Sequence, residues 1–120
     1  MHTDNFVKDL FAIVDRMDGA SLASKMTEDG VFRFGNIPGI TGRDNVTAFL
    51  DNFFQSIQAI RHDQLEGWVI DNTRFGTGRV TYTRHNGTEL SVPFSVILKM
   101  KGGLIHEYLI FVDGSELYKQ

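Results

Sequence analysis

The side chains that could carry chemistry in this 120-residue chain are few, and they lie on separate segments. The chain has no cysteine, which excludes disulfides, thiolate metal sites and a cysteine nucleophile. Its four histidines lack the paired spacing of zinc ligands, so we expect no metal site. His62 begins an apolar and aromatic segment, and its imidazole could act as a base. Asp113 ends another such segment, where its carboxylate could act as an acid or could begin a turn with Gly114 and Ser115.

Helices are predicted in the first half of the chain and strands in the second, and these elements must position the candidate side chains. Apolar residues at helical spacing predict a first helix over 6–17, followed by a short second helix that ends near Gly30. A third helix over 46–57 has the clearest pattern. Thr41 and Asp44 have the spacing of a capping box at its start.

A short strand is predicted over 31–34, and longer strands dominate the second half of the chain. Four segments rich in β-branched and aromatic residues cover 61–71, 75–85, 89–100 and 104–113. Asn86-Gly87 between two of them is typical of a hairpin, so we expect an antiparallel meander. Long strands twist and curl, and helices across the concave face would enclose a pocket. We therefore expect an α+β fold in which a strongly curved antiparallel sheet packs against three N-terminal helices around a cone-shaped apolar pocket.

Composition sets the class of protein. A hydrophobic fraction of 42% and a charged fraction of 22% are those of a globular chain, and we expect a single domain over 1–120. The net charge of −3 and the absence of a basic run argue against nucleic acid or an anionic membrane as partners. No stretch approaches 18 apolar residues, so a cytoplasmic protein is the default expectation.

Several short motifs follow one another in a characteristic order along nearly the whole chain. They are Glu28-Asp29-Gly30-Val31-Phe32-Arg33-Phe34, Gly42-Arg43-Asp44, His62, Asn86-Gly87, Gly103-Leu104-Ile105 and Phe111-Val112-Asp113. Their order and spacing resemble the SnoaL-like branch of the nuclear transport factor two-like superfamily, whose fold is a cystatin-like α+β cone. Members of this superfamily include polyketide cyclases, epoxide hydrolases, ketosteroid isomerases, dehydratases and proteins without catalytic activity, so the fold alone does not give the function.

The resemblance also implies which strand residues face the pocket. They are Arg79, Thr81 and Thr83 on one strand, Pro93, Ser95 and Ile97 on the next, and Glu107, Leu109, Phe111 and Asp113 on the last. In that arrangement Asp113 would be a general acid or base whose pKa is raised by its apolar surroundings. Arg79 would orient or polarise an oxygen, and His62 would assist. Each has a structural alternative: a turn for Asp113, a surface charge for Arg79 and a hydrogen bond between the third helix and the sheet for His62.

Two activities of the superfamily are argued against by single residues. The carboxylates of ketosteroid isomerases fall here near Phe34 and Ser95, which leaves no base and no strong hydrogen-bond donor. Epoxide hydrolases of the limonene type have Arg-x-Asp where this chain has Arg79 and Thr81, and a hydroxyl cannot replace that carboxylate as a base.

The expected partners are a small hydrophobic molecule and a second copy of the chain. Residues expected to contact the small molecule are Phe34, Phe53, Trp68, Thr81, Ser95, Glu107 and Phe111. Val80, Tyr82 and Tyr108 fall on the opposite face of the sheet in the arrangement that the resemblance implies. Apolar side chains on that face need a cover, so we expect a homodimer through the outer face of the sheet.

Two functions are compatible with these residues. One is a cyclase, isomerase or dehydratase that needs no cofactor and acts on a small hydrophobic carbonyl compound through Asp113, Arg79 and His62. The other is a non-catalytic ligand-binding or dimerisation module. An enzyme requires ionisable groups that converge in an open cavity, whereas a binding module requires only the cavity.

Overall fold

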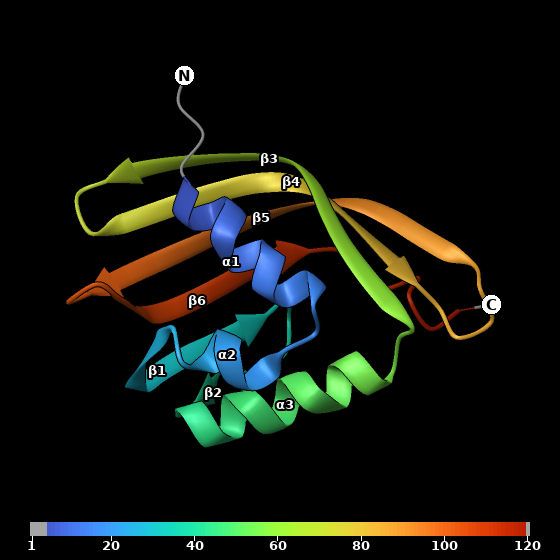
Figure 1. Ribbon diagram of the computed structural model, residues 1–120, viewed down its shortest axis with the longest axis horizontal. Helices are drawn as coiled ribbons and strands as arrows, with labels where there is room; N and C mark the ends of the chain where they lie inside the picture. The colour runs from blue at the N-terminus through green and yellow to red at the C-terminus, as the bar shows by residue number, and fades with distance from the viewer. Residues whose placement is uncertain (1–4, 120) are drawn as a thin grey trace.

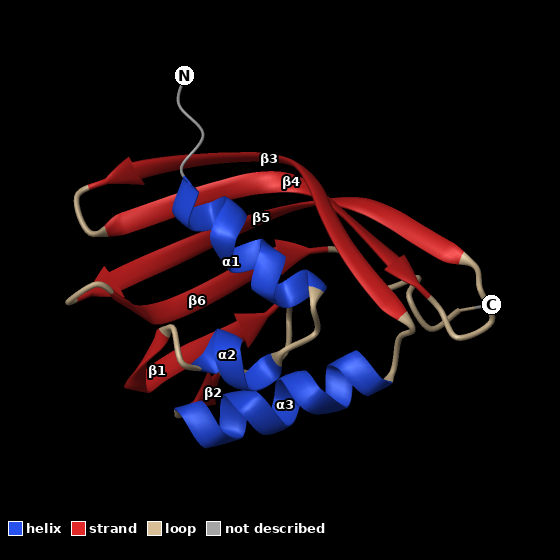
Figure 2. Ribbon diagram, in the orientation of Figure 1, coloured by secondary structure: helices blue, strands red, loops and turns tan. Residues whose placement is uncertain are grey.

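The computed structural model describes residues 5–119 and has three helices and a six-stranded sheet within them (Figures 1 and 2). The helices are α1 (Asn5–Asp15), α2 (Gly19–Ala23) and α3 (Arg43–Gln55). The strands are β1 (Met26–Phe34), β2 (Ile40–Thr41), β3 (Ala59–Ile70), β4 (Thr73–Thr83), β5 (Glu89–Lys101) and β6 (Leu104–Val112). None of the described helices has both the length and the hydrophobicity required to cross a membrane.

The four C-terminal strands form the antiparallel meander that the sequence predicted. The sheet order is β2-β1-β6-β5-β4-β3, with antiparallel pairing from β3 through β6. The connections lie at or near the ends of the predicted strand segments, and Asp71, Gly87, Gly102 and Gly103 take positive φ angles there. At the other end of the meander, β1 pairs with β6 in parallel, which brings the first described strand beside the last (Figure 1). The α+β class with a curved sheet and N-terminal helices is confirmed.

Two predicted helix boundaries are wrong. The second helix ends at Ala23, and the chain from Met26 is already in β1, where its backbone groups pair with β6. Gly30 does not end a helix. It lies within the stretch between Met26 and Val31 where the register between β1 and β6 shifts, and a Cβ there would stand 3.2 Å from the Ile105 carbonyl oxygen. The capping box is also absent, because Thr41 lies in β2 and α3 begins after Gly42 without a side-chain cap.

The helices cover the concave face of the sheet. α1 lies across this face and contacts β3, whereas α3 runs beside β1 and packs on α2 (Figure 2). Val7 of α1 approaches β4 closely because position 76 is glycine, where a Cβ would stand 3.1 Å from Val7 Cγ1. The buried stripe of α1 is Val7, Leu10, Phe11 and Val14, as its helical spacing predicted.

Strand register shows which side chains face the helices. Directly opposed residues share a face, so each row of partners points either inward or outward. The inward rows include Ile60–Tyr82–Leu90, His62–Val80–Val92, Phe94–Val112, Phe34–Ile110–Val96 and Phe32–Tyr108–Leu98. Many of these residues are buried, whereas the alternating rows Arg61–Thr81–Ser91, Arg79–Pro93 and Thr77–Ser95–Phe111 lie on the convex face.

Candidate functional site

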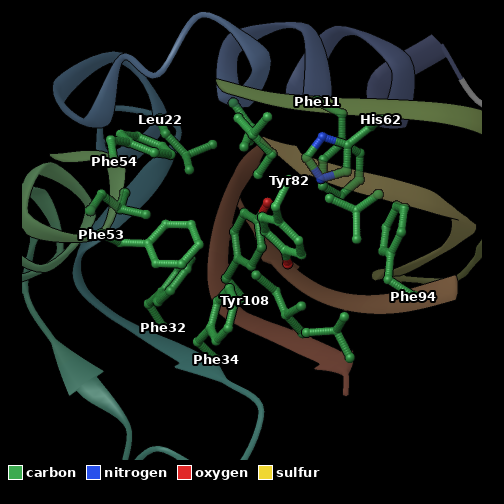
Figure 3. Close-up of a pocket in the computed structure, with 16 residues that line it drawn as sticks. Phe11, Leu22, Phe32, Phe34, Phe53, Phe54, His62, Tyr82, Phe94 and Tyr108 are labelled. Carbon is green, nitrogen blue, oxygen red and sulfur yellow. The ribbon is translucent and has the colours of Figure 1, made fainter. Parts of the chain in front are cut away.

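An aromatic cavity lies between the inward rows of the sheet and the three helices (Figure 3). Its free volume is about 30 Å³, which leaves room for about one or two water-sized groups. The lining residues are Phe11, Val14, Leu22, Phe32, Phe34, Leu50, Phe53, Phe54, Ile60, His62, Val80, Tyr82, Phe94, Tyr108, Ile110 and Val112. Polar atoms come from three of these side chains, one histidine and two tyrosines, so the interior is apolar with a few isolated polar groups.

His62 supplies the imidazole in this cavity, and aromatic rings hold it in place. Its side chain is 6% exposed, and its ring centroid lies 4.5 Å from that of Phe11 and 5.2 Å from that of Phe94. Phe11 comes from α1 and Phe94 from β5, so the imidazole is held between helix and sheet. Of the three residues predicted to be catalytic, His62 is the one that lines the interior cavity among the described residues.

The carboxylate of Asp15 fixes the orientation of this imidazole. Asp15 Oδ1 lies 2.5 Å from His62 Nδ1, and Asp15 Oδ2 accepts a hydrogen bond from the His62 backbone N–H at 3.1 Å. An ionised carboxylate can only accept, so Nδ1 carries a proton. Nε2 of a neutral imidazole is then a proton acceptor, and within residues 5–119 no protein group is bonded to it.

Two tyrosine hydroxyls complete the polar groups of the cavity (Figure 3). Tyr108 is 0% exposed, and its hydroxyl has no hydrogen-bond partner among the described residues. Burial raises the pKa of Tyr108 well above its usual range. Burial, with a smaller contribution from nearby Tyr118, raises the pKa of Tyr82 to about 12. Both phenols are therefore neutral hydrogen-bond donors at physiological pH.

A wider depression of about 300 Å³ adjoins the interior cavity. The two share Phe34, Phe53, Tyr82 and Val112 in their linings, so the depression is called the mouth here. Its other lining residues are Gly35, Asn36, Ile37, Phe49, Asp113, Gly114, Ser115, Leu117 and Tyr118. The mouth therefore offers more room and more polar atoms than the interior.

Asp113 lies in the lining of the mouth, but its environment differs from the predicted one. The residue is exposed, and its Oδ1 accepts a hydrogen bond from Ser115 N at 3.1 Å. Hydrogen bonds from the Ser115 hydroxyl and backbone lower the pKa of Asp113, so the predicted upward shift is wrong. An exposed carboxylate that begins a turn is ionised at neutral pH and is poorly suited to act as a general acid.

The remaining predicted residues divide by the face they occupy. Phe34 and Phe53 line both the interior cavity and the mouth. Five others lie outside both linings, in rows that point to the convex face: Trp68, Thr81, Ser95, Glu107 and Phe111. Arg79 is also on that face, where its guanidinium donates to Ser91 Oγ and to the Ser91 carbonyl oxygen, each at 3.1 Å. The predicted placement of these six residues in the pocket is wrong.

The assignment of these strand residues to the wrong face of the sheet has a simple physical cause. Residues 79–83 alternate between polar and apolar side chains, and the apolar pair Val80 and Tyr82 is inward, at 1% and 2% exposure. Burying such side chains stabilises the fold by roughly 1.5–3 kcal/mol each, which decides the face of the whole strand. A shift of one residue exchanges every side chain between the two faces. Tyr108 in β6 is inward for the same reason, whereas the resemblance implied that it faces outward.

Asp15, Tyr82 and Tyr108 are site residues that the sequence interpretation missed. Asp15 is the last residue of α1, and the last turn of α1 has no basic residue. A carboxylate is unfavourable at a helix C-terminus, where backbone carbonyl groups give a partial negative charge. A carboxylate at an unfavourable helix end could have identified Asp15 from the sequence, because residues that oppose the local structural preference are often functional.

This arrangement can hold and move one proton in an apolar interior. Asp15 orients His62, His62 presents a proton acceptor to the cavity, and the phenols can donate hydrogen bonds to an oxygen atom. Because the lining is otherwise apolar, electrostatic interactions inside it are screened less than in water.

A family model described as a SnoaL-like domain matches residues 7–108 of the chain. No curated protein matches the sequence. Among solved structures, a candidate polyketide cyclase from Xanthomonas campestris pv. campestris is similar, with a TM-score of 0.86, 16% identity, and coverage of 97% of this chain and 93% of that chain.

Two further structures have the same fold. A hypothetical protein from Catenulispora acidiphila with a ketosteroid isomerase-like fold, solved with trimethylamine, has a TM-score of 0.83 and 14% identity over 92% of this chain and 86% of that one. ActVI-ORFA from Streptomyces coelicolor has a TM-score of 0.73 and 22% identity over 91% and 93% of the two chains. At these identities the similarity extends to the fold.

Proposed function

Because the chain belongs to the SnoaL-like domain family, we propose that it binds a small apolar molecule in the mouth, with one group of that molecule in the aromatic cavity, and that His62 moves a proton on the molecule. The reaction class is that of a cyclase, isomerase or dehydratase without a cofactor. This class includes the polyketide cyclase activity after which one structural neighbour is described.

The observation that carries the proposal is the Asp15–His62 pair at the cavity wall. Among the described lining residues of the interior, His62 has the one side chain that ordinarily exchanges a proton near neutral pH. A base that works at neutral pH must be held within reach of the reacting atom and in one tautomer. The carboxylate of Asp15 supports both requirements, since it bonds the imidazole at Nδ1 and the backbone at the His62 N–H.

The proposed role of Asp113 changes accordingly. It remains at the mouth, where an ionised carboxylate would repel anionic molecules more than neutral ones. His62 takes the place of Asp113 as the proposed acid or base, with Asp15 as its positioning residue.

Proton exchange in heavy water tests this proposal. Carbonyl compounds that raise the melting temperature would be incubated with the protein, and loss of the proton signal next to the carbonyl would be followed by NMR. We expect His62→Gln to bind these compounds but to lose catalysed exchange. Asp113→Asn should exchange at the wild-type rate, and a loss of exchange in that variant would return the acid–base role to Asp113.

A non-catalytic ligand-binding or dimerisation module is the second candidate, and the aromatic side chains that fill most of the cone favour it. Aromatic rings leave about 30 Å³ free, which is far less than a drug-sized ligand occupies. Ligands that stabilise the wild type and His62→Gln equally, with no exchange in either, would support binding without chemistry.

We also propose that the chain forms a homodimer through the convex face of the sheet. Val80, Tyr82 and Tyr108, which suggested this dimer in the sequence, are buried inside the cone instead. The convex face has its own apolar residues, namely Phe75, Pro93, Ile97, Leu109 and Phe111. Phe111 is 51% exposed, and a second copy of the same face would cover it.

A further inference from the structure

We infer that the Tyr108 hydroxyl is the hydrogen-bond donor that holds a carbonyl oxygen of the substrate beside His62, so that the substrates are neutral carbonyl compounds able to form an enolate. This inference rests on the proposed function, because it assigns the substrate class of the same cavity. Tyr108 and His62 come from different strands, β6 and β3, and both side chains line the interior (Figure 3).

The Tyr108 hydroxyl is an exception to the way buried polar groups are satisfied. The side chain is 0% exposed, and its Oη has no partner among the described residues. Nearly all buried hydroxyls are hydrogen-bonded, since an unsatisfied one costs roughly 1–3 kcal/mol. Phenylalanine would fill the same space without this cost. A ligand atom that accepts the hydrogen bond of this hydroxyl would explain why a destabilising donor is present in the cavity wall.

Cavity size indicates which part of a ligand reaches this hydroxyl. The interior holds about 30 Å³, enough for a single polar group, whereas the adjoining mouth holds about 300 Å³. The body of the ligand would occupy the mouth, and its oxygen would enter the interior. Phe34 and Phe53, which line both spaces, would contact the apolar atoms between these two parts.

The interior is unsuited to an anionic ligand group, because its described lining has no permanently positive side chain. None of the described residues that line it is Lys or Arg. A carboxylate or phosphate there would lie buried without a cation, which is strongly unfavourable. A carbonyl oxygen is neutral, accepts hydrogen bonds and fits a neutral donor. Burial keeps Tyr108 protonated because it raises the pKa of the phenol.

These two groups suffice for enolisation. The C–H bond next to the carbonyl breaks and its proton bonds to Nε2 of neutral His62. The electron pair of that bond forms the C=C double bond of the enolate, and the π pair of the carbonyl group moves onto its oxygen. Tyr108 Oη–H then donates to the enolate oxygen, where the negative charge has developed. Return of the proton to the same carbon, or to a conjugated one, restores the carbonyl and the neutral imidazole.

Affinity for two molecules of matched shape tests the inference directly. Acetophenone and α-methylstyrene differ in that a carbonyl oxygen in the first is a methylene group in the second. We expect Tyr108→Phe to weaken acetophenone binding by about tenfold, the value of one hydrogen bond, and to leave α-methylstyrene binding unchanged. Dissociation constants would be measured by ligand titration followed by NMR.

Stability of the ligand-free protein gives a second, independent readout. Since Tyr108 Oη has no partner among the described residues, Tyr108→Phe should melt at the wild-type temperature or above it. The matched control is Thr81→Val, which removes a buried hydroxyl bonded to Ser91 Oγ at 3.2 Å on the convex face. That control should lower the melting temperature and leave both affinities unchanged.

The outcomes separate this inference from the proposed function. Equal weakening of both ligands, or unchanged binding of both, would refute the role of Tyr108 while the cavity remained a ligand site. A lower melting temperature for Tyr108→Phe would also refute it, because the hydroxyl would then serve the free protein. If neither molecule bound the wild type, the proposed cavity function would fail, and this inference with it.

Discussion

At the scale of single residues, the pairing of Asp15 with His62 departs from what helix electrostatics favours. The carboxylate ends α1, where the helix dipole is unfavourable for it, and compensation comes from an imidazole 47 positions later in the chain. His62 was identified as a candidate from its residue type and from the resemblance to SnoaL-like sequences. Asp15 was missed because its partner is distant in the sequence, and pairings of that kind follow from tertiary packing.

Asp15→Asn tests whether this carboxylate positions the base. The amide keeps the size of the side chain but can donate to Nδ1, which favours the wrong tautomer of His62. We expect kcat for proton exchange to fall by about 10²-fold or more, with little change in KM. Steady-state rates over a range of substrate concentrations separate the two constants. A rise in KM with kcat unchanged would assign Asp15 to binding instead.

Tyr82 predicts how stability changes at alkaline pH. Burial raises its pKa to about 12 from an ordinary value of 10.0, so the unfolded chain loses this proton first. The stabilisation is therefore complete below pH 10 and is lost as pH rises toward 12, by on the order of 2 kcal/mol. The free energy of unfolding would be measured in urea at several values from about pH 9 to about pH 12. It should decline less steeply with pH for Tyr82→Phe than for the wild type. Identical slopes would show that Tyr82 is solvated in the folded protein.

At the scale of elements, the sequence predicted the type and order of the helices and strands better than it predicted which face of the sheet each side chain occupies. Helical spacing found α1 and α3, and turn residues such as Asn86-Gly87 found the hairpins of the meander. Burial of Val80 and Tyr82 could also have been predicted from their alternation with polar neighbours. The positions where the register between two strands shifts could not be predicted, because they depend on how the strands pair. Gln64, for example, has a φ of 55° where the register between β3 and β4 shifts.

Gly78 allows β3 and β4 to remain paired close to that shift. A Cβ at this position would stand 2.8 Å from the Asp63 carbonyl oxygen and 3.0 Å from Phe94 Cε1. Gly78→Ala should therefore reduce the free energy of unfolding by about 1–3 kcal/mol, because a backbone group would have to shift. Chemical denaturation measures this change. Gly114→Ala is the matched control, since nothing lies within 4 Å of a Cβ there, and an equal loss in both variants would exclude the steric explanation.

At the scale of the whole molecule, the cone-shaped fold and its family were predictable, whereas the packing of side chains inside the cone was not. The order of motifs indicated the fold, because long antiparallel strands after three helices have few compact arrangements. The volume of the cavity depends on how the nine aromatic rings of its lining pack, and the movement of one ring to another rotamer would displace a volume at least as large as the free space.

The proposed dimer predicts a change of mass after one substitution. Phe111 is half exposed on the convex face, and a charge at this position would be buried in a two-fold interface without a partner. We expect the wild type to elute with the mass of two chains in light-scattering chromatography, and Phe111→Arg with the mass of one. A wild type that elutes as one chain would refute the dimer, and Phe111 would then be an exposed residue without a protein partner.

The position of β6 in the sheet has a consequence for the synthesis of the protein. β6 is the last described strand along the chain, yet it lies between β1 and β5 and joins the two halves of the sheet. While the ribosome is still making residues 104–112, the edges of β1 and β5 that it will join are open, and apolar surface around them stays in contact with water. The cone can therefore close only after this strand has left the exit tunnel and can insert between its neighbours.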